Sequence, residues 1–134
     1  DIDKGLPFKD NVIDAIYSNY FLEHTTDLIF IFQEMYRVCK GNALVVLTVP
    51  YYASINAFKD PTHKNFFTEE TFRYFSKDKW YGSDYNFGVD FRVKNIKYHY
   101  ANLAKILPFK KYIRRYLMNM VGAITVELEA VKEG

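Results

Sequence analysis

The sequence predicts an α/β fold in which a helix connects two parallel strands. Residues 12–18 (VIDAIYS) are β-prone and carry a single charge. Residues 43–50 (ALVVLTVP) are almost wholly apolar, as expected of a strand that helices cover on both faces. A strand, a helix and a strand in this order favour a right-handed crossover, and ligands of such sheets bind beyond the carboxyl ends of the strands. We therefore expect a site at residues 17–24 (YSNYFLEH) and 48–56 (TVPYYASIN).

The connecting helix has sequence signals at both ends. Thr25, Thr26 and Asp27 are candidates for its N-terminal cap, and Gly41 with Asn42 supplies a stop signal. Apolar residues recur between them at helical spacing, namely Leu28, Ile31, Phe32, Met35 and Val38. The spacing predicts an amphipathic helix that turns this face toward the sheet.

The second half of the chain predicts two helices and two strands. A capped helix is expected from Thr68 to about Ser76. Residues 90–102 and 123–132 alternate between apolar and polar side chains, as strands do. Residues 109–122 (FKKYIRRYLMNMVG) form an amphipathic pattern, with an apolar stripe and four basic residues elsewhere.

Composition limits the classes of protein to consider. An apolar fraction of 49% over 134 residues fits one folded domain and argues against disorder. The net charge of +2 is too small to indicate nucleic acid as a partner. Cys39 is the single cysteine, so an intrachain disulfide and cysteine-based metal clusters are excluded, which favours a cytoplasmic location. The longest apolar run is too short for a membrane-spanning helix.

Three segments together carry a family resemblance. Residues 6–24 (LPFKDNVIDAIYSNYFLEH), 33–50 (QEMYRVCKGNALVVLTVP) and 60–72 (DPTHKNFFTEETF) resemble, in order and spacing, the second half of a class I S-adenosylmethionine-dependent methyltransferase of the methyltransferase type 11-like kind. Gly41-Asn42-Ala43 replaces the Pro-Gly-Gly turn of that family, a tolerable change because Gly and Asn both accept a left-handed backbone.

The resemblance implies a Rossmann-like methyltransferase fold truncated to about strands four to seven. This is a mixed sheet with an antiparallel last strand and flanking helices. The chain starts at Asp1, and its six glycines form no glycine-rich loop. We therefore expect residues 1–134 to be a single partial methyltransferase domain that lacks the N-terminal glycine-rich cofactor-binding half, and we expect this fragment alone to be inactive.

The resemblance also implies candidate cofactor contacts. The segment DIDKG resembles the loop in which the family uses an acidic residue and the next backbone amide to hold adenine, which indicates Asp1 with Ile2, or else Asp3. Polar residues at the end of the first strand resemble those that contact the methionyl part of S-adenosylmethionine, namely Ser18, Asn19 and Tyr20. The alternatives are a solvated turn acid and simple capping of the next turn.

Methyl transfer to a hydroxyl needs an aligned acceptor and a group that removes its proton. His24 and His63 follow the two strand ends and are the candidate catalytic residues, since histidine titrates in the useful range. The alternative for His24 is a structural hydrogen bond. Tyr51 and Tyr52 are candidates for binding the substrate, a small-molecule or saccharide-type acceptor, or else for packing. Neither Glu23 nor any pair of histidines has a spacing that indicates a metal site.

Two other hypotheses concern partners. A half-domain that acts as a non-catalytic interaction module would expose a strand edge, so we expect a homodimer joined near residues 12–18 or through the apolar face that further helices would cover. The basic amphipathic segment 109–121 could instead lie on an anionic membrane surface, or pack its apolar stripe on the sheet. No nucleic-acid reader motif is present.

Overall fold

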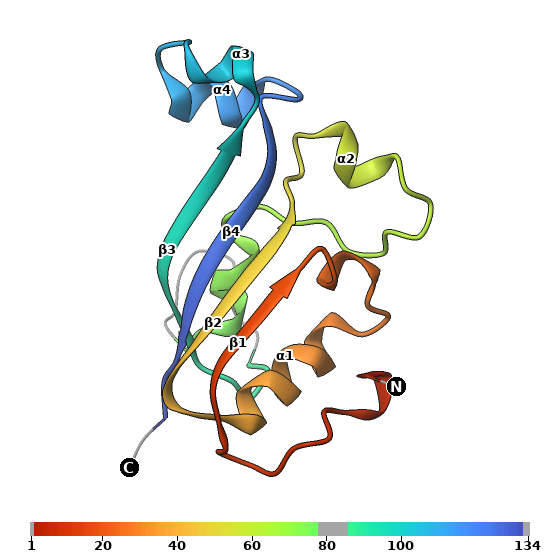
Figure 1. Ribbon diagram of the computed structural model, residues 1–134, viewed down its shortest axis with the longest axis vertical. Helices are drawn as coiled ribbons and strands as arrows, with labels where there is room; N and C mark the ends of the chain where they lie inside the picture. Colours follow the sequence, from red (N-terminus) through yellow and green to blue (C-terminus); the bar gives the residue numbers. More distant parts are fainter. Residues whose placement is uncertain (1, 78–85, 133–134) are drawn as a thin grey trace.

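The core of the molecule is a mixed four-stranded sheet with the strand order β1-β2-β4-β3 (Figure 1). The computed structural model describes residues 2–77 and 86–132. Strands β1 (Ile13–Asn19) and β2 (Cys39–Pro50) are parallel, whereas β4 (Val121–Ala130) is antiparallel both to β2 and to β3 (Phe91–Tyr100). This arrangement confirms the predicted strand–helix–strand unit and the antiparallel last strand.

Helix α1 (Leu28–Val38) makes the crossover between β1 and β2. Of the three predicted caps, Asp27 is the one used, because its carboxylate accepts from the Phe30 amide at 3.0 Å. The predicted apolar face is buried through Ile31, Phe32, Met35 and Val38. The helix ends at Val38, three residues before the predicted stop signal at Gly41, because β2 begins at Cys39 and pairs there with Ile13. Gly41 and Asn42 therefore lie inside the strand, with Asn42 in a left-handed conformation (φ 67°).

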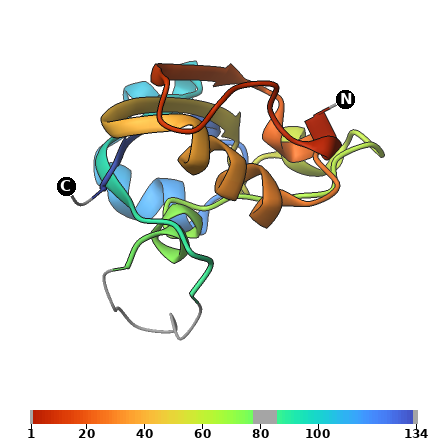
Figure 2. The ribbon, with the colours of Figure 1, turned by 90° about the horizontal axis from the view of Figure 1, so that it is seen from below.

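The helix predicted from Thr68 is a short 3₁₀ turn, η3 (Thr71–Phe75). Side chains three residues apart align in a 3₁₀ helix, and here Phe72 and Phe75 are both buried. The Phe75 ring stacks on Phe32 of α1 at 3.8 Å between centroids. Figure 2 shows α1 and η3 on the same side of the sheet. One face of the sheet therefore carries the aromatic core.

Five short elements lie beside α1 or near the ends of the strands (Figure 1). They are η1 (Ile2–Lys4), η2 (Leu22–His24), α2 (Ile55–Phe58), α3 (Asn102–Lys105) and α4 (Lys110–Tyr116). No helix of the described residues is long and apolar enough to cross a membrane. The turn η2 follows β1, and α2 follows β2, so both lie beyond the carboxyl ends of the parallel strands (Figure 1).

Helix α4 is shorter than predicted, and the residues that it half-buries are Lys110, Ile113 and Arg114. The Arg114 guanidinium lies 4.3 Å from the centroid of the Tyr98 ring, and Lys110 Nζ lies 5.7 Å from that of Tyr100. Three aromatic residues of the predicted stripe are instead exposed, namely Phe109 (76%), Tyr112 (61%) and Tyr116 (72%). The alternative that the apolar stripe packs on the sheet is therefore wrong for these three aromatic residues, whereas Ile113 of the stripe is half-buried. The tyrosines of β3 attract cations to their faces.

Candidate functional site

The loops after β1 and β2 are tied together by hydrogen bonds. The Asn65 side-chain amide donates to the Leu22 carbonyl at 2.9 Å and to the Thr25 carbonyl at 2.8 Å. The backbone amides of Lys64 and Asn65 donate to the Glu23 carbonyl at 2.6 and 3.1 Å. These bonds fix η2, which carries Glu23 and His24, against the loop that carries His63.

The His24 ring is held through one nitrogen. Its Nδ1 lies 3.0 Å from the Thr62 hydroxyl, which itself donates to Asp60 Oδ1 at 2.7 Å. Because the hydroxyl has one hydrogen and gives it to Asp60, it accepts from His24, so Nδ1 carries the ring proton. A neutral His24 then has its lone pair on Nε2. The hydroxyl and backbone amide of Thr62 hold the pKa of Asp60 below its usual range, so this carboxylate stays ionised.

The His63 ring is held in the same tautomer by a different partner. Its Nδ1 lies 2.9 Å from the Ala57 carbonyl, which can only accept, so Nδ1 again carries the proton. The His24 and His63 rings meet edge to face at 4.7 Å between centroids. Two imidazoles with the lone pair on Nε2 therefore lie side by side. His63 Nε2 lies 3.6 Å from Asp60 Oδ2, which is too far for a hydrogen bond.

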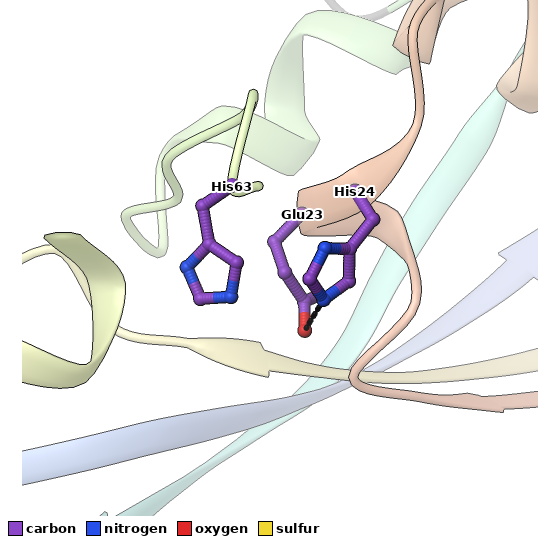
Figure 3. A group of neighbouring side chains, drawn as sticks. All are labelled: Glu23, His24 and His63. Atoms are coloured by element: carbon purple, nitrogen blue, oxygen red, sulfur yellow. Dashed lines mark ion pairs between the residues drawn. The ribbon is translucent and has the colours of Figure 1, made fainter. Parts of the chain in front are cut away.

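The Glu23 carboxylate completes this group and is 2% exposed. Its Oε1 lies 3.8 Å from His24 Nε2, and its Oε2 is buried without a hydrogen-bond partner among the described residues. Figure 3 shows the three side chains pointing toward one another. One possible ligand atom from each lies within 4.8 Å of those from the other two.

These side chains open onto a cleft of about 480 Å³ at the carboxyl ends of β1 and β2. Its other walls include Tyr20, Asn56, Lys59, Asp60 and His99. Tyr20 has a left-handed backbone (φ 54°), which is costly for a bulky residue and concentrates at functional sites. The Tyr20 amide donates to the Thr48 carbonyl at 2.9 Å, and this bond holds the strained turn at the mouth of the cleft.

Comparison with known proteins identifies the fold. The sequence pattern of a family described as a methyltransferase domain matches residues 1–47. A SAM-dependent methyltransferase from Archaeoglobus fulgidus superposes with a TM-score of 0.64 at 20% identity, over 91% of this chain and 61% of that one. The chain has the class I methyltransferase fold. The predicted resemblance and fold class are thereby confirmed. No curated protein sequence matches the chain.

Other proteins with the methyltransferase fold are described as having different activities. A SAM-dependent methyltransferase from Thermotoga maritima, described as a possible histamine N-methyltransferase, gives a TM-score of 0.58 at 17% identity over 96% of this chain and 60% of that one. The cyclase SpnF gives 0.62 at 14% identity, over 96% and 53%. The chain thus spans between half and two thirds of the length of these proteins. Because one fold serves several reactions, the chemistry has to be argued from the site.

The predicted cofactor residues lie along the end of β1 and near the start of the chain. Ser18 is half-buried, and Asn19 and Tyr20 are exposed. Ile2 packs against the core, while Asp1 lies outside the described residues. Asp3 borders a second hollow of about 360 Å³ with Thr26, Asp27 and Phe30. Contact with the cofactor stays a prediction for all of them.

The two tyrosines predicted to bind substrate differ in exposure. Tyr51 is fully buried, and its hydroxyl donates to Glu69 at 2.7 Å. Burial, reinforced by this carboxylate, raises the pKa of Tyr51 above its ordinary value. Tyr52 is half-buried and donates to the Arg115 carbonyl at 2.8 Å. The burial of Tyr51 agrees with the packing alternative, and the binding role of both residues stays a prediction.

Sequence reasoning rejected Glu23 as a metal ligand and missed Thr62 and Asn65 as parts of the site. Glu23 stands directly before His24, yet a glutamate in a loop is normally exposed, so nothing local predicts its burial. Thr62 and Asn65 flank His63 in the segment DPTHKN. A signal was present there, because short polar side chains around a turn often bond to neighbouring backbone or side chains.

Proposed function

We propose that the protein transfers the methyl group of S-adenosylmethionine to a hydroxyl group of a small-molecule or saccharide-type acceptor. The observation that carries the proposal is the pair of histidines at the carboxyl ends of β1 and β2. Each has its Nδ1–H held by a partner, and the nearest carboxylate oxygen to each Nε2, at 3.8 Å for His24 and 3.6 Å for His63, is too far to form a hydrogen bond. A hydroxyl acceptor needs such a base, and the cleft that these atoms face is of a size that admits a small ligand.

The residues present fit the cofactor at the end of β1. S-adenosylmethionine bears amino groups that need acceptors and an adenine ring that needs an apolar partner. Asp3 and Asp27 offer carboxylates beside the Phe30 ring in one hollow, and Ser18 and Asn19 offer polar side chains at the strand end. Tyr20, directly after them, has a left-handed backbone (φ 54°).

When bound, the cofactor supplies an electrophilic methyl group, and the protein mainly positions the acceptor and takes up its proton. With the cofactor bound, the acceptor oxygen would take the methyl group while the electron pair of the carbon–sulfur bond stayed on sulfur. The hydroxyl proton goes to Nε2 of His24 or His63. Thr62 or the Ala57 carbonyl, bonded at Nδ1, keeps the ring oriented and supports the charge it gains.

Calorimetric titration of the full-length gene product with S-adenosylhomocysteine tests this proposal. We expect binding, and we expect Asn19→Ala to weaken it by about tenfold, the loss of about 1.4 kcal/mol. Lys97→Ala, on an exposed position of β3, is the matched control and should bind as the wild type does. If the wild-type protein does not bind, the methyltransferase proposal fails and the non-catalytic interaction module takes its place.

We propose a membrane surface as a second candidate partner, because α4 displays its aromatic residues to solvent. Phe109, Tyr112 and Tyr116 are exposed, and so are Lys111 and Arg115 on the same helix. Residues 101–120 contain five basic and no acidic residues. Aromatic rings beside cations suit the interface of an anionic bilayer.

Sedimentation with vesicles tests the membrane proposal. The wild-type chain should pellet with vesicles that contain phosphatidylserine, and less with purely zwitterionic ones. Tyr112→Ser combined with Tyr116→Ser should reduce pelleting severalfold. Tyr74→Ser, a tyrosine outside α4, is the control. Equal pelleting of the wild type and the α4 variant would overturn this proposal.

A further inference from the structure

We propose that Glu23, His24 and His63 bind one divalent transition-metal ion. The three residues come from two loops, and one ligand atom of each lies within 4.8 Å of the others. Independently, Glu23 Oε2 is fully buried with no hydrogen-bond partner among the described residues. The role proposed for the ion, activation of the acceptor oxygen, rests on the proposed methyl transfer, but the binding itself does not.

The buried carboxylate is the first argument for a cation. Taking an ionised carboxylate out of water costs several kcal/mol unless it is paired or coordinates a metal. The ion pair that Glu23 makes is with His24 Nε2, at 3.8 Å, a distance too long for a hydrogen bond. Within residues 2–77 and 86–132, its Oε2 has no hydrogen-bond partner. A divalent ion between Glu23 and the two rings would compensate the buried charge.

The histidine tautomers are the second argument. Metal-binding histidines usually donate their other ring N–H to a carbonyl or carboxylate, which fixes the ring and makes it a better ligand. His63 donates from Nδ1 to the Ala57 carbonyl, and His24 donates to the Thr62–Asp60 pair. Both Nε2 atoms thereby keep their lone pairs for an ion on the side of Glu23 (Figure 3), and the Asp60 Oδ2 atom, 3.6 Å from His63 Nε2, adds negative charge beside it.

The ligand set indicates the class of metal. Two imidazoles and one carboxylate suit Zn²⁺ and related first-row ions, and they leave at least one position open. Ligands of a tetrahedral ion with bonds of about 2.1 Å lie about 3.4 Å apart, so binding requires an inward movement of up to about 1.4 Å. Rotation of the two rings and of the glutamate side chain provides this movement.

The open coordination position would face the cleft, where the acceptor hydroxyl would bind. A metal-bound hydroxyl loses its proton near neutral pH. The proton then leaves to solvent, because the Nε2 atoms are occupied by the ion. The oxygen would then take the methyl group, and the electron pair of the carbon–sulfur bond would stay on sulfur. His24 and His63 would thus act as ligands when the ion is present.

Titration of the untagged 134-residue chain with Zn²⁺ alone tests the proposal, without cofactor or acceptor. Calorimetry should give one equivalent bound, and Co²⁺ used as a spectroscopic probe should give visible absorption typical of a low-coordinate site. Glu23→Gln and His63→Gln should each weaken Zn²⁺ binding by at least about tenfold. His99→Gln is the matched control, because His99 borders the same cleft outside the group.

Each outcome of this titration bears on the metal site alone. Binding that the Glu23 and His63 variants lose and the His99 variant keeps supports the site. Absence of Zn²⁺ binding by the wild type, or binding that the His99 variant loses equally, overturns it. Circular dichroism of the apo variants shows whether they are folded, and Glu23→Asp keeps the charge if Glu23→Gln does not fold. Cofactor binding is measured separately, so the two proposals can fail independently.

Discussion

Asn65→Ala should destabilise the protein because Asn65 joins the two loops of the site. Its side-chain amide donates one hydrogen to each of the Leu22 and Thr25 carbonyls, at 2.9 and 2.8 Å. Leu22 and Thr25 are buried, and losing a hydrogen bond to a buried acceptor costs about 1 kcal/mol at the lower end of the range, so the free energy of unfolding should fall by about 2 kcal/mol. An unfolding entropy of about 0.28 kcal/mol/K is expected for 134 residues. The melting temperature should therefore fall by about 7 °C.

Thermal unfolding followed by circular dichroism measures this change, with Asn95→Ala on an exposed position of β3 as the control. The control should melt within about 2 °C of the wild type, because surface substitutions usually change stability by less than 0.5 kcal/mol. Asn65→Ala should also weaken Zn²⁺ binding, since it frees Glu23 and His24 to move away from His63. A variant that melts with the wild type would refute the reasoning that Asn65 clamps the site.

Three further outcomes are expected. Burial raises the pKa of the Cys39 thiol to about 11, so alkylation at pH 8 should be at least about 100-fold slower in the folded chain than in urea; equal rates would show that the thiol is accessible. The Arg37 guanidinium holds the pKa of Glu34 below its usual value, so this pair stabilises the fold above about pH 4.3 and its contribution is lost as the pH falls. Glu34→Gln should flatten that acid branch in urea unfolding, and an unchanged branch would contradict the assignment. Sizing with light scattering should give a dimer joined at the exposed β1 edge, which Tyr17→Lys weakens; a wild-type monomer would contradict it.

The crossover unit could be predicted because its signals are local. The apolar run of β2 and the helical spacing of α1 indicate a strand, a helix and a strand in sequence. Such a unit with parallel strands almost always has a right-handed crossover. The end of α1 could not be placed. Gly41 and Asn42 are typical helix stops, but pairing of Cys39 with Ile13 extends the strand through them. A long-range contact of this kind decides the boundary and leaves no trace in the local pattern.

The orientation of α4 could not be predicted for a similar reason. Its amphipathic pattern is clear, but which face meets the sheet depends on what the sheet presents. Tyr98 and Tyr100 offer ring faces to Arg114 and Lys110. The usual rule that the apolar stripe faces inward assumes an aliphatic surface beneath it, and the tyrosines of β3 favour cations there.

The topology predicts where the candidate site lies, but the sequence does not predict which side chains meet there. The rule that ligands bind beyond the carboxyl ends of parallel strands selects the segments that hold His24 and His63. These histidines are 39 positions apart, which is not a recognised metal-ligand spacing. Their meeting with the buried Glu23 depends on the clamp at Asn65, and such contacts between loops arise only in the folded chain.

Amide chemical-shift mapping with S-adenosylhomocysteine tests the central claim most directly, namely that the end of β1 binds the methyl donor. The full-length gene product, labelled with ¹⁵N, is titrated and the shifted amides are assigned. The account predicts that shifts concentrate at residues 2–5 and 18–24, with little change in α4. Saturable shifts confined to other parts of the chain, or none at all, would contradict it.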